Sequence, residues 1–298
     1  MYIITHRGLF FWITGVMLVA AIGSILAFGL PLGIDFTGGS MMQVSYKDGR
    51  PATSVIQEQI APLSLGTVSV RAAGENAVSI RTRTMTPVEH DAALAALSKD
   101  TNASELSYTS VGPALGSQFA NKALWAIFAV IFVIMLYIAF AFRKVSKPVP
   151  SWGYGITVVA MLAIDIIVPA GFYAAFCHFT GAEVDSLFIV ALLSLLGYCV
   201  NDVIVIFDRI REHLTRNERI NNKESFEDTI GKSINETMTR SINTALTVVL
   251  ALLALIFLGA DTTRNFALVM LVGILAGTFS SIARSAPLLI PLAKWFAK

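Results

Sequence analysis

The chain has 298 residues, of which 55% are hydrophobic and only 14% charged, whereas an ordinary soluble domain carries about 25% charged residues. This composition argues against a water-soluble protein, and a net charge of +2 gives no electrostatic basis for binding nucleic acid. Cys177 and Cys199 lie in or beside apolar segments without a spaced set of further ligands, so we expect packing residues, no metal site and no cofactor.

Six apolar segments are long enough to cross a bilayer as helices, which takes about 20 residues. The first of them exceeds the roughly 7–15 apolar residues of a cleavable signal, so we expect it to stay in the membrane. Each segment is apolar on all its faces and does not alternate between apolar and polar residues, which favours helices over barrel strands. The segments are Leu9–Leu30, Ala123–Phe142, Trp152–Phe176, Leu187–Phe207, Ser241–Ala260 and Phe266–Ala283.

A more polar region, residues 31–121, separates the first two segments and predicts a small α+β domain. Thr86-Pro87-Val88-Glu89 is a capping-box sequence with proline at the first helical position, so a helix should follow to about Lys99. The resulting strand and helix order is βαββαβ, which is the ferredoxin-like arrangement. The strands are Met41–Tyr46, Thr67–Ala73, Ala77–Arg83 and Ala103–Val111; the first helix is Thr53–Leu63, and the hairpin turn is Gly74-Glu75-Asn76.

Basic residues between the apolar segments predict the orientation of the chain. Arg143, Lys144 and Lys147 join the second and third segments, and a strongly basic stretch from Arg209 to Arg240 joins the fourth and fifth. Short loops rich in Lys and Arg stay in the cytoplasm. We therefore expect both termini inside and three parts: a first transmembrane helix (1–30), an extracytoplasmic ferredoxin-like domain (31–121), and a five-helix transmembrane region with a cytoplasmic C-terminus (122–298).

Two aspartates inside the apolar segments are the main candidates for chemistry. An acid in a membrane helix costs roughly 2.5–3.5 kcal/mol on insertion scales, so Asp165 and Asp202 need a reason to be there. One reason is proton carriage, in which Asp202 alternates between binding a proton and pairing with Arg240 at the start of the fifth segment. The other is structural: each acid is a hydrogen-bond partner between helices, and Arg240 is an orientation signal.

Several other features have structural explanations. Gly273, Gly277 and Ser281 form a stripe of small residues typical of close helix packing, and Gly38-Gly39 indicates a turn. Four charged residues beyond the fourth segment should form a solvated, self-paired helix end; they are Asp208, Arg209, Arg211 and Glu212.

Four motifs in this order resemble the SecF branch of the SecD/SecF protein-export family, within the resistance-nodulation-division superfamily. They are Gly33-Ile34-Asp35-Phe36-Thr37-Gly38-Gly39, Val111-Gly112-Pro113-Ala114-Leu115-Gly116, the block from Gly197 to Glu212 that contains Asn201-Asp202, and Met238-Thr239-Arg240-Ser241. Arg284 departs from the pattern, since a neutral residue is expected there, and we interpret it as reaching the cytoplasmic interface.

The resemblance implies a non-enzymatic subunit of the bacterial inner membrane that pairs with SecD on a separate chain. The pair would associate with the SecYEG channel and, in many bacteria, YajC, and would use the proton motive force to help pull preproteins outward. Asp202 would be the proton-linked acid and Arg240 its partner, and Asp165 resembles the family's acid on the third span. The motif positions Asp35, Gly38, Gly39, Gly112, Pro113 and Asn201 would have structural roles.

Two other functions remain as alternatives. A half-transporter for drugs or lipids would use the same helical plan, although the Gly33–Gly39 motif and the single small domain argue against it. An intramembrane aspartyl protease would use Asp165 and Asp202. Asp202 does not follow the Gly-x-Gly of such proteases, and helical rise puts the two acids at different depths, roughly 18 Å and 8 Å from the inner face.

Overall fold

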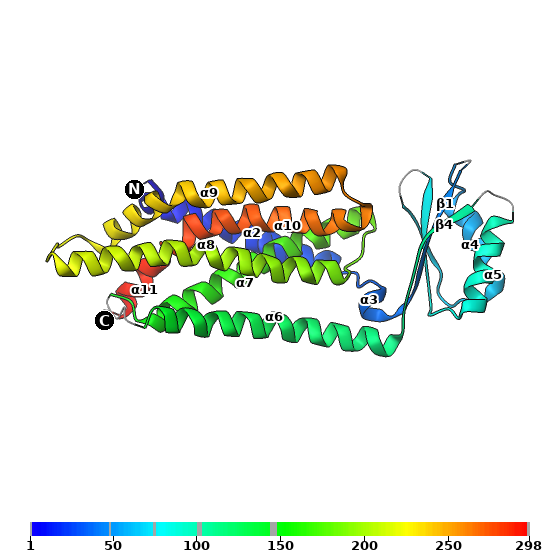
Figure 1. Cartoon of the computed structure of the whole chain (residues 1–298), viewed down its shortest axis with the longest axis horizontal. Coiled ribbons are helices and arrows are strands. Elements are labelled where there is room, and N and C mark those ends of the chain that lie inside the picture. The colour runs from blue at the N-terminus through cyan, green and yellow to red at the C-terminus, as the bar shows by residue number, and fades with distance from the viewer. Residues whose placement is uncertain (1, 48, 74–75, 100–102, 144–147, 297–298) are drawn as a thin grey trace. The chain divides into compact units, whose positions relative to one another are not determined.

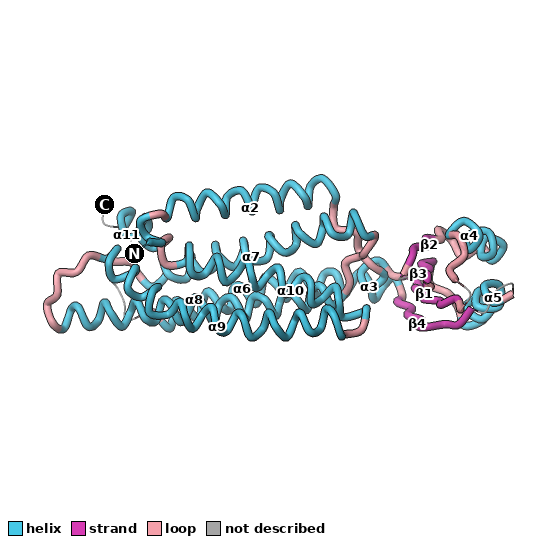
Figure 2. Tube along the Cα trace, turned by 90° about the horizontal axis from the view of Figure 1, so that it is seen from above, coloured by secondary structure: helices cyan, strands magenta, loops and turns pink. Residues whose placement is uncertain are grey.

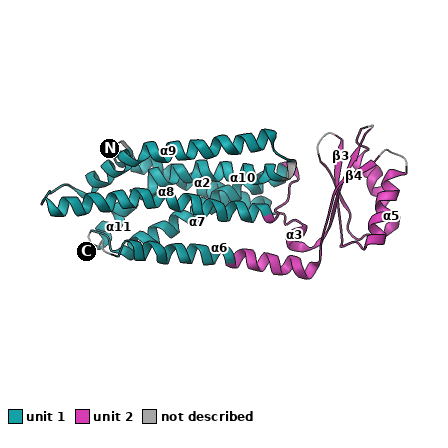
Figure 3. Ribbon diagram, in the orientation of Figure 1, with its two compact units in different colours: residues 1–30, 126–179, 187–298 teal, residues 31–125, 180–186 magenta. Residues whose placement is uncertain are grey.

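The computed structural model describes residues 2–47, 49–73, 76–99, 103–143 and 148–296 (Figure 1). The predicted turn residues Gly74 and Glu75, and the basic residues Lys144 and Lys147, lie outside the described residues. The chain forms two compact units, coloured separately in Figure 3. Unit 1 comprises Met1–Leu30, Ala126–Phe179 and Leu187–Lys298, and unit 2 comprises Pro31–Trp125 and Thr180–Ser186.

Among the described residues, six helices are long and apolar enough to cross a membrane, as predicted. Helices α2, α7, α8, α9 and α10 run alongside one another in unit 1 (Figures 1 and 2). Short elements precede and follow them: α1 (Tyr2–Thr5), a π-helical turn η2 (Ser281–Ser285) and α11 (Leu289–Phe296). The long helices are α2 (Arg7–Phe28), α6 (Pro113–Ala141), α7 (Ser151–Thr180), α8 (Ser186–Arg219), α9 (Phe226–Leu258) and α10 (Asp261–Ser280).

Two of these helices continue well beyond the predicted apolar segments. Helix α8 runs past Phe207 to Arg219, and α9 begins at Phe226, before the apolar segment that starts at Ser241. Charged side chains do not end a helix when they find partners. The self-pairing predicted for this end of α8 is confirmed by ion pairs of 2.5 Å between Arg211 and Asp208 and between Arg209 and Glu212; Arg209 also pairs with Glu236 on α9.

Glycines permit the closest helix contacts in unit 1. A Cβ atom at Gly171 on α7 would overlap the backbone of Ala21 on α2, and Ser24 donates a hydrogen bond of 2.7 Å to the Gly171 carbonyl. A Cβ at Gly273 on α10 would overlap the side chain of Leu195 on α8. The packing role predicted for the stripe of small residues on α10 is therefore confirmed at Gly273.

Unit 2 has the predicted βαββαβ order. Its four antiparallel strands lie in the order β2-β3-β1-β4, with α4 (Thr53–Ile60) and α5 (Pro87–Ser98) together on one side of the sheet (Figure 2). Alternate residues of β1 and β3 pack against the two helices, with Val44, Ile56 and Leu97 fully buried. The strands are β1 (Gly39–Tyr46), β2 (Ser69–Ala72), β3 (Ala77–Thr82) and β4 (Ala103–Val111), and a 3₁₀ turn η1 (Ala61–Leu63) follows α4.

The capping box predicted at the start of α5 is present. The Glu89 amide donates to the Thr86 hydroxyl at 3.4 Å, and the Glu89 carboxylate accepts from the Thr86 amide at 2.8 Å. Arg83 donates to the same carboxylate at 2.5 Å. These hydrogen bonds lower the pKa of Glu89 to about 2; the one from Arg83 has the largest effect, and the one from the Thr86 backbone has the next largest.

This lowered pKa predicts an acid-sensitive start of α5. Because the pKa of Glu89 is about 2 in the folded protein and about 4.3 in an unfolded chain, its stabilising effect is complete above about pH 4.3 and disappears as the pH falls toward about 2. Hydrogen exchange of the amides in the first turn of α5, measured on the full chain, should therefore accelerate over this window. Glu89→Gln should exchange faster above the window and lose the acceleration; an unchanged pH dependence in that variant would contradict the assignment.

Candidate functional site

Asp202 lies near the middle of α8, half-buried, and its carboxylate joins three helical segments of unit 1. Its Oδ1 accepts a hydrogen bond from the Ser241 hydroxyl on α9, and its Oδ2 accepts one from the Ser281 hydroxyl at the start of η2. One side chain that can bind a proton is therefore a shared partner of α8, α9 and η2.

Asp165 on α7 has a partner that the sequence reasoning missed. Asp165 and Arg284 are only 2% and 3% exposed, and the Asp165 Oδ1 lies 4.0 Å from the Arg284 Nη2. The same Nη2 donates to the Ser280 hydroxyl at 2.5 Å. The expectation that Arg284 reaches the membrane interface is wrong, because its guanidinium turns into the bundle. The available signal was a cation between two apolar stretches, 266–283 and 286–293, because a charge among apolar residues in a membrane needs a partner inside the bundle.

Asp165 and Asp202 are linked to two adjacent serines. Ser280 binds Arg284, the partner of Asp165, and Ser281 binds Asp202 directly. Gly277, one turn earlier on α10, leaves the space for this arrangement. A Cβ at Gly277 would overlap the Cys199 sulfur and lie 4.0 Å from the Asp165 Cγ. Cys199 is buried and free of a disulfide, in agreement with the packing role expected of it.

Two expectations about this site stay predictions. The depth estimate was counted from the end of the apolar segment at Phe207, and the charged residues with which α8 continues to Arg219 do not change it. Arg240 is exposed, as is Asn201, and within the described part of the chain no hydrogen bond or ion pair joins Arg240 to Asp202. Ser241, the next residue, binds Asp202 instead, and pairing with Arg240 stays a prediction.

In unit 2 the two glycine-containing motifs pack against each other. Gly38 and Gly39 have φ angles of +76° and +126°, which disfavour other residues, so the predicted turn needs both glycines. A Cβ at Gly38 would lie 2.6 Å from the Pro113 Cα, and a Cβ at Gly116 would lie 2.7 Å from the Gly38 nitrogen. Gly112 has open space around its Cα, so close packing does not explain the glycine there.

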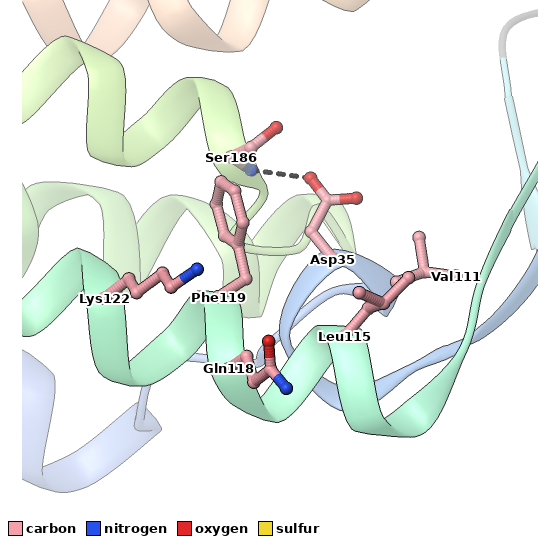
Figure 4. A pocket seen from close by; sticks show the side chains of 7 residues that line it. All are labelled: Asp35, Val111, Leu115, Gln118, Phe119, Lys122 and Ser186. Carbon is pink, nitrogen blue, oxygen red and sulfur yellow. Dashed lines mark hydrogen bonds between the residues drawn. The ribbon is translucent and has the colours of Figure 1, made fainter.

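Asp35 of the first motif binds the segment Thr180–Ser186 within unit 2. Its Oδ2 accepts a hydrogen bond of 2.8 Å from the amide of Ser186, the first residue of α8 (Figure 4). Beside it lies an open pocket of about 340 Å³, whose other lining residues are Val111, Leu115, Gln118, Phe119 and Lys122. A carboxylate at the first amides of a helix is a favourable cap.

The same segment is held to the sheet by further contacts. Val184 exchanges backbone hydrogen bonds of 2.8 Å with Pro31 and Gly33, and the Glu183 carboxylate pairs with Arg71 at 2.9 Å and Arg81 at 2.8 Å.

Comparison with known families explains why these motifs occur together. The family described as "Protein export membrane protein SecD/SecF, C-terminal" matches residues 91–295, and the "SecD/SecF GG Motif" matches residues 23–49. The chain belongs to the SecD/SecF family. It is therefore a multi-pass membrane protein involved in protein transport, and this membership gives no support to the protease alternative.

Relatives within the SecD/SecF family cover nearly the whole chain. The "Protein translocase subunit SecF" of Thermobaculum terrenum is 37% identical over 97% of this chain and 92% of its own length. That of Sebaldella termitidis is 35% identical over 97% of this chain and 91% of its own length. The crystal structure of SecDF, a translocon-associated membrane protein from a Thermus species, superposes with a TM-score of 0.82 and 27% identity over 98% of this chain. The chain spans 38% of that solved chain.

Proposed function

We propose that this chain, a SecF-type subunit of the Sec protein translocase, couples proton movement to preprotein export. The observation that carries the proposal is the position of Asp202. A carboxylate in a membrane-spanning helix accepts hydrogen bonds from two other helical segments, through Ser241 and Ser281. Acids in such segments are common in proton relays.

The hydrogen bonds of Asp202 suggest how proton binding moves helices. The ionised carboxylate only accepts, so both serine hydroxyls must point toward it. A protonated carboxyl group donates one hydrogen bond itself, and one serine must then accept or withdraw. Proton occupancy therefore selects between two arrangements of α8, α9 and η2. A membrane potential supplies about 2.3 kcal/mol per charge per 100 mV to drive the cycle.

The proposed orientation places the basic loops and both termini in the cytoplasm and unit 2 outside the bacterial inner membrane. There unit 2 would act on the emerging preprotein. Arg240 would be an alternative partner of Asp202 in a second arrangement of the helices, as the family resemblance implies. A link to SecD is supported by the "Protein translocase subunit SecDF" of Bacillus subtilis, which is 32% identical over 93% of this chain. The match covers only 36% of that longer protein, whose name combines SecD with SecF.

Exposed apolar side chains in unit 1 fit contact with lipid and with such a subunit. Leu26 on α2, Phe128 on α6 and Leu258 on α9 are 81%, 65% and 87% exposed. SecYEG and YajC are the further partners that the proposal assigns.

Reconstituted membranes test this function. Vesicles containing SecYEG, SecD and this chain should translocate preprotein faster when a proton gradient is present, and an ionophore that collapses the gradient should remove the stimulation. Vesicles without this chain provide the control. Equal stimulation with and without the gradient would contradict proton coupling, whereas proton-driven efflux of a small molecule by the purified chain would favour the half-transporter.

A further inference from the structure

Two buried charged residues, Asp165 and Arg284, have no role in the coupling through Asp202. Arg284 lies in η2 and is only 3% exposed. An arginine side chain stays positively charged in proteins, so it cannot relieve its burial by releasing a proton. A buried charge must instead be paired. The nearest acid is Asp165, at 4.0 Å.

The other ionisable groups around Arg284 leave Asp165 as its partner. Helix α8 supplies two ionisable groups. The Cys199 thiol lies near Gly277, as Asp165 does, and the Asp202 carboxylate is bound by Ser241 and Ser281. Helix α2 contacts η2, but its cation Arg7 pairs with Glu227 at 3.2 Å. Two polar atoms of the pair, the Asp165 Oδ2 and the Arg284 Nε, have no hydrogen-bond partner among the described residues.

We propose that Arg284 is a positioning residue of the proton-coupling site: it holds Asp165 as a carboxylate, so that the exchangeable proton resides on Asp202. This inference rests on the proposed function. One arginine and two ionised aspartates carry a net charge of −1, and a proton on Asp202 brings the site to zero. Without the arginine, the same two acids would carry −2, and mutual repulsion would keep a proton bound.

Burial assigns the two acids to different tasks. Asp165 is 2% exposed and faces a fixed cation, whereas Asp202 is half-buried and accepts its hydrogen bonds from two serine hydroxyl groups that can turn. Protons can reach Asp202 more readily, and its hydrogen bonds can reverse when it is protonated. The adjacent residues Ser280 and Ser281 connect the two halves, because one binds Arg284 and the other binds Asp202.

Infrared spectroscopy of the purified full chain in lipid vesicles tests this inference, because a protonated carboxylic acid has a carbonyl band that a carboxylate lacks. In the native protein, Asp165 should contribute no such band at about pH 7. Arg284→Met should create one, since the unpaired buried Asp165 takes up a proton. The band should disappear when Asp165→Asn is added and should be absent in Arg284→Lys, which keeps the positive charge.

Export measurements supply the functional half of the test. Arg284→Met should remove most of the gradient-dependent stimulation, because the exchangeable proton is then no longer confined to Asp202, and Arg284→Lys should restore most of it. A folded Arg284→Met protein without the Asp165 band would overturn the inference, as would an Asp165 band already present in the native protein. The native spectrum remains decisive if Arg284→Met fails to fold. The infrared result does not depend on export. An export assay without proton coupling would refute the proposed function, whereas an unexpected Asp165 band would refute only the role of Arg284.

Discussion

Replacing Asp202 with asparagine is expected to abolish gradient-dependent stimulation of export while leaving the protein assembled with its partners. Asparagine has nearly the same shape, and its amide can still bond to Ser241 and Ser281. It cannot bind or release a proton at any accessible pH. Stimulation in the reconstituted vesicles should therefore fall to the level seen without a gradient, with co-purification of the partners unchanged.

A second acid on the same helix provides a matched control. Asp208 is exposed on α8 and forms a 2.5 Å ion pair with Arg211. Asp208→Asn removes the same charge from the same helix, and such exposed pairs contribute only about 0–1 kcal/mol. We expect near-native stimulation in this variant. Full stimulation in Asp202→Asn, or equal loss in both variants, would contradict a specific role for Asp202.

Asp165→Asn should have the largest effect on stability. The change leaves Arg284 buried without a negative partner, and breaking one side of a buried pair costs about 3–5 kcal/mol. The free energy of unfolding in detergent micelles should fall by that amount. Adding Arg284→Met to Asp165→Asn should recover most of the loss, because removing both charges removes the uncompensated one.

An exposed pair again provides the comparison. Glu212→Gln breaks the 2.5 Å contact with Arg209 at the end of α8, where the two side chains are 65% and 36% exposed. It should change the free energy of unfolding by about 0–1 kcal/mol. If Asp165→Asn changed stability no more than Glu212→Gln, the Arg284 charge would not depend on Asp165.

The sequence predicted the helices and strands that are determined by patterns among neighbouring residues. Six apolar runs became six long helices, and the Thr86–Glu89 pattern became a capping box. Strand Ala103–Val111 has the predicted ends, because alternation along a strand is also a local signal. Helices α8 and α9 extend beyond the predicted apolar segments, because charged residues there pair across the two helices, between Arg209 and Glu236.

The candidate site was predicted only in part, for a physical reason. An acid in an apolar run is visible without a structure, so Asp165 and Asp202 were found. Their partners are far along the chain: Arg284 belongs to a different helix from Asp165, and Ser241 and Ser281 are ordinary residues in ordinary surroundings. Sequence reasoning preferred the charged neighbour Arg240, because charge is conspicuous in a sequence and the direction of a side chain is not.

The attachment of Thr180–Ser186 to the sheet has a practical consequence for mapping the topology of this protein. Short connections between spans are usual places for epitope tags, protease sites and reporter enzymes. Here Glu183 is held by two arginines, and Ser186 is capped by Asp35. An insertion in Thr180–Ser186 would break these contacts. A reporter found on the unexpected side of the membrane would then indicate damage to the protein, and not the side on which this connection normally lies.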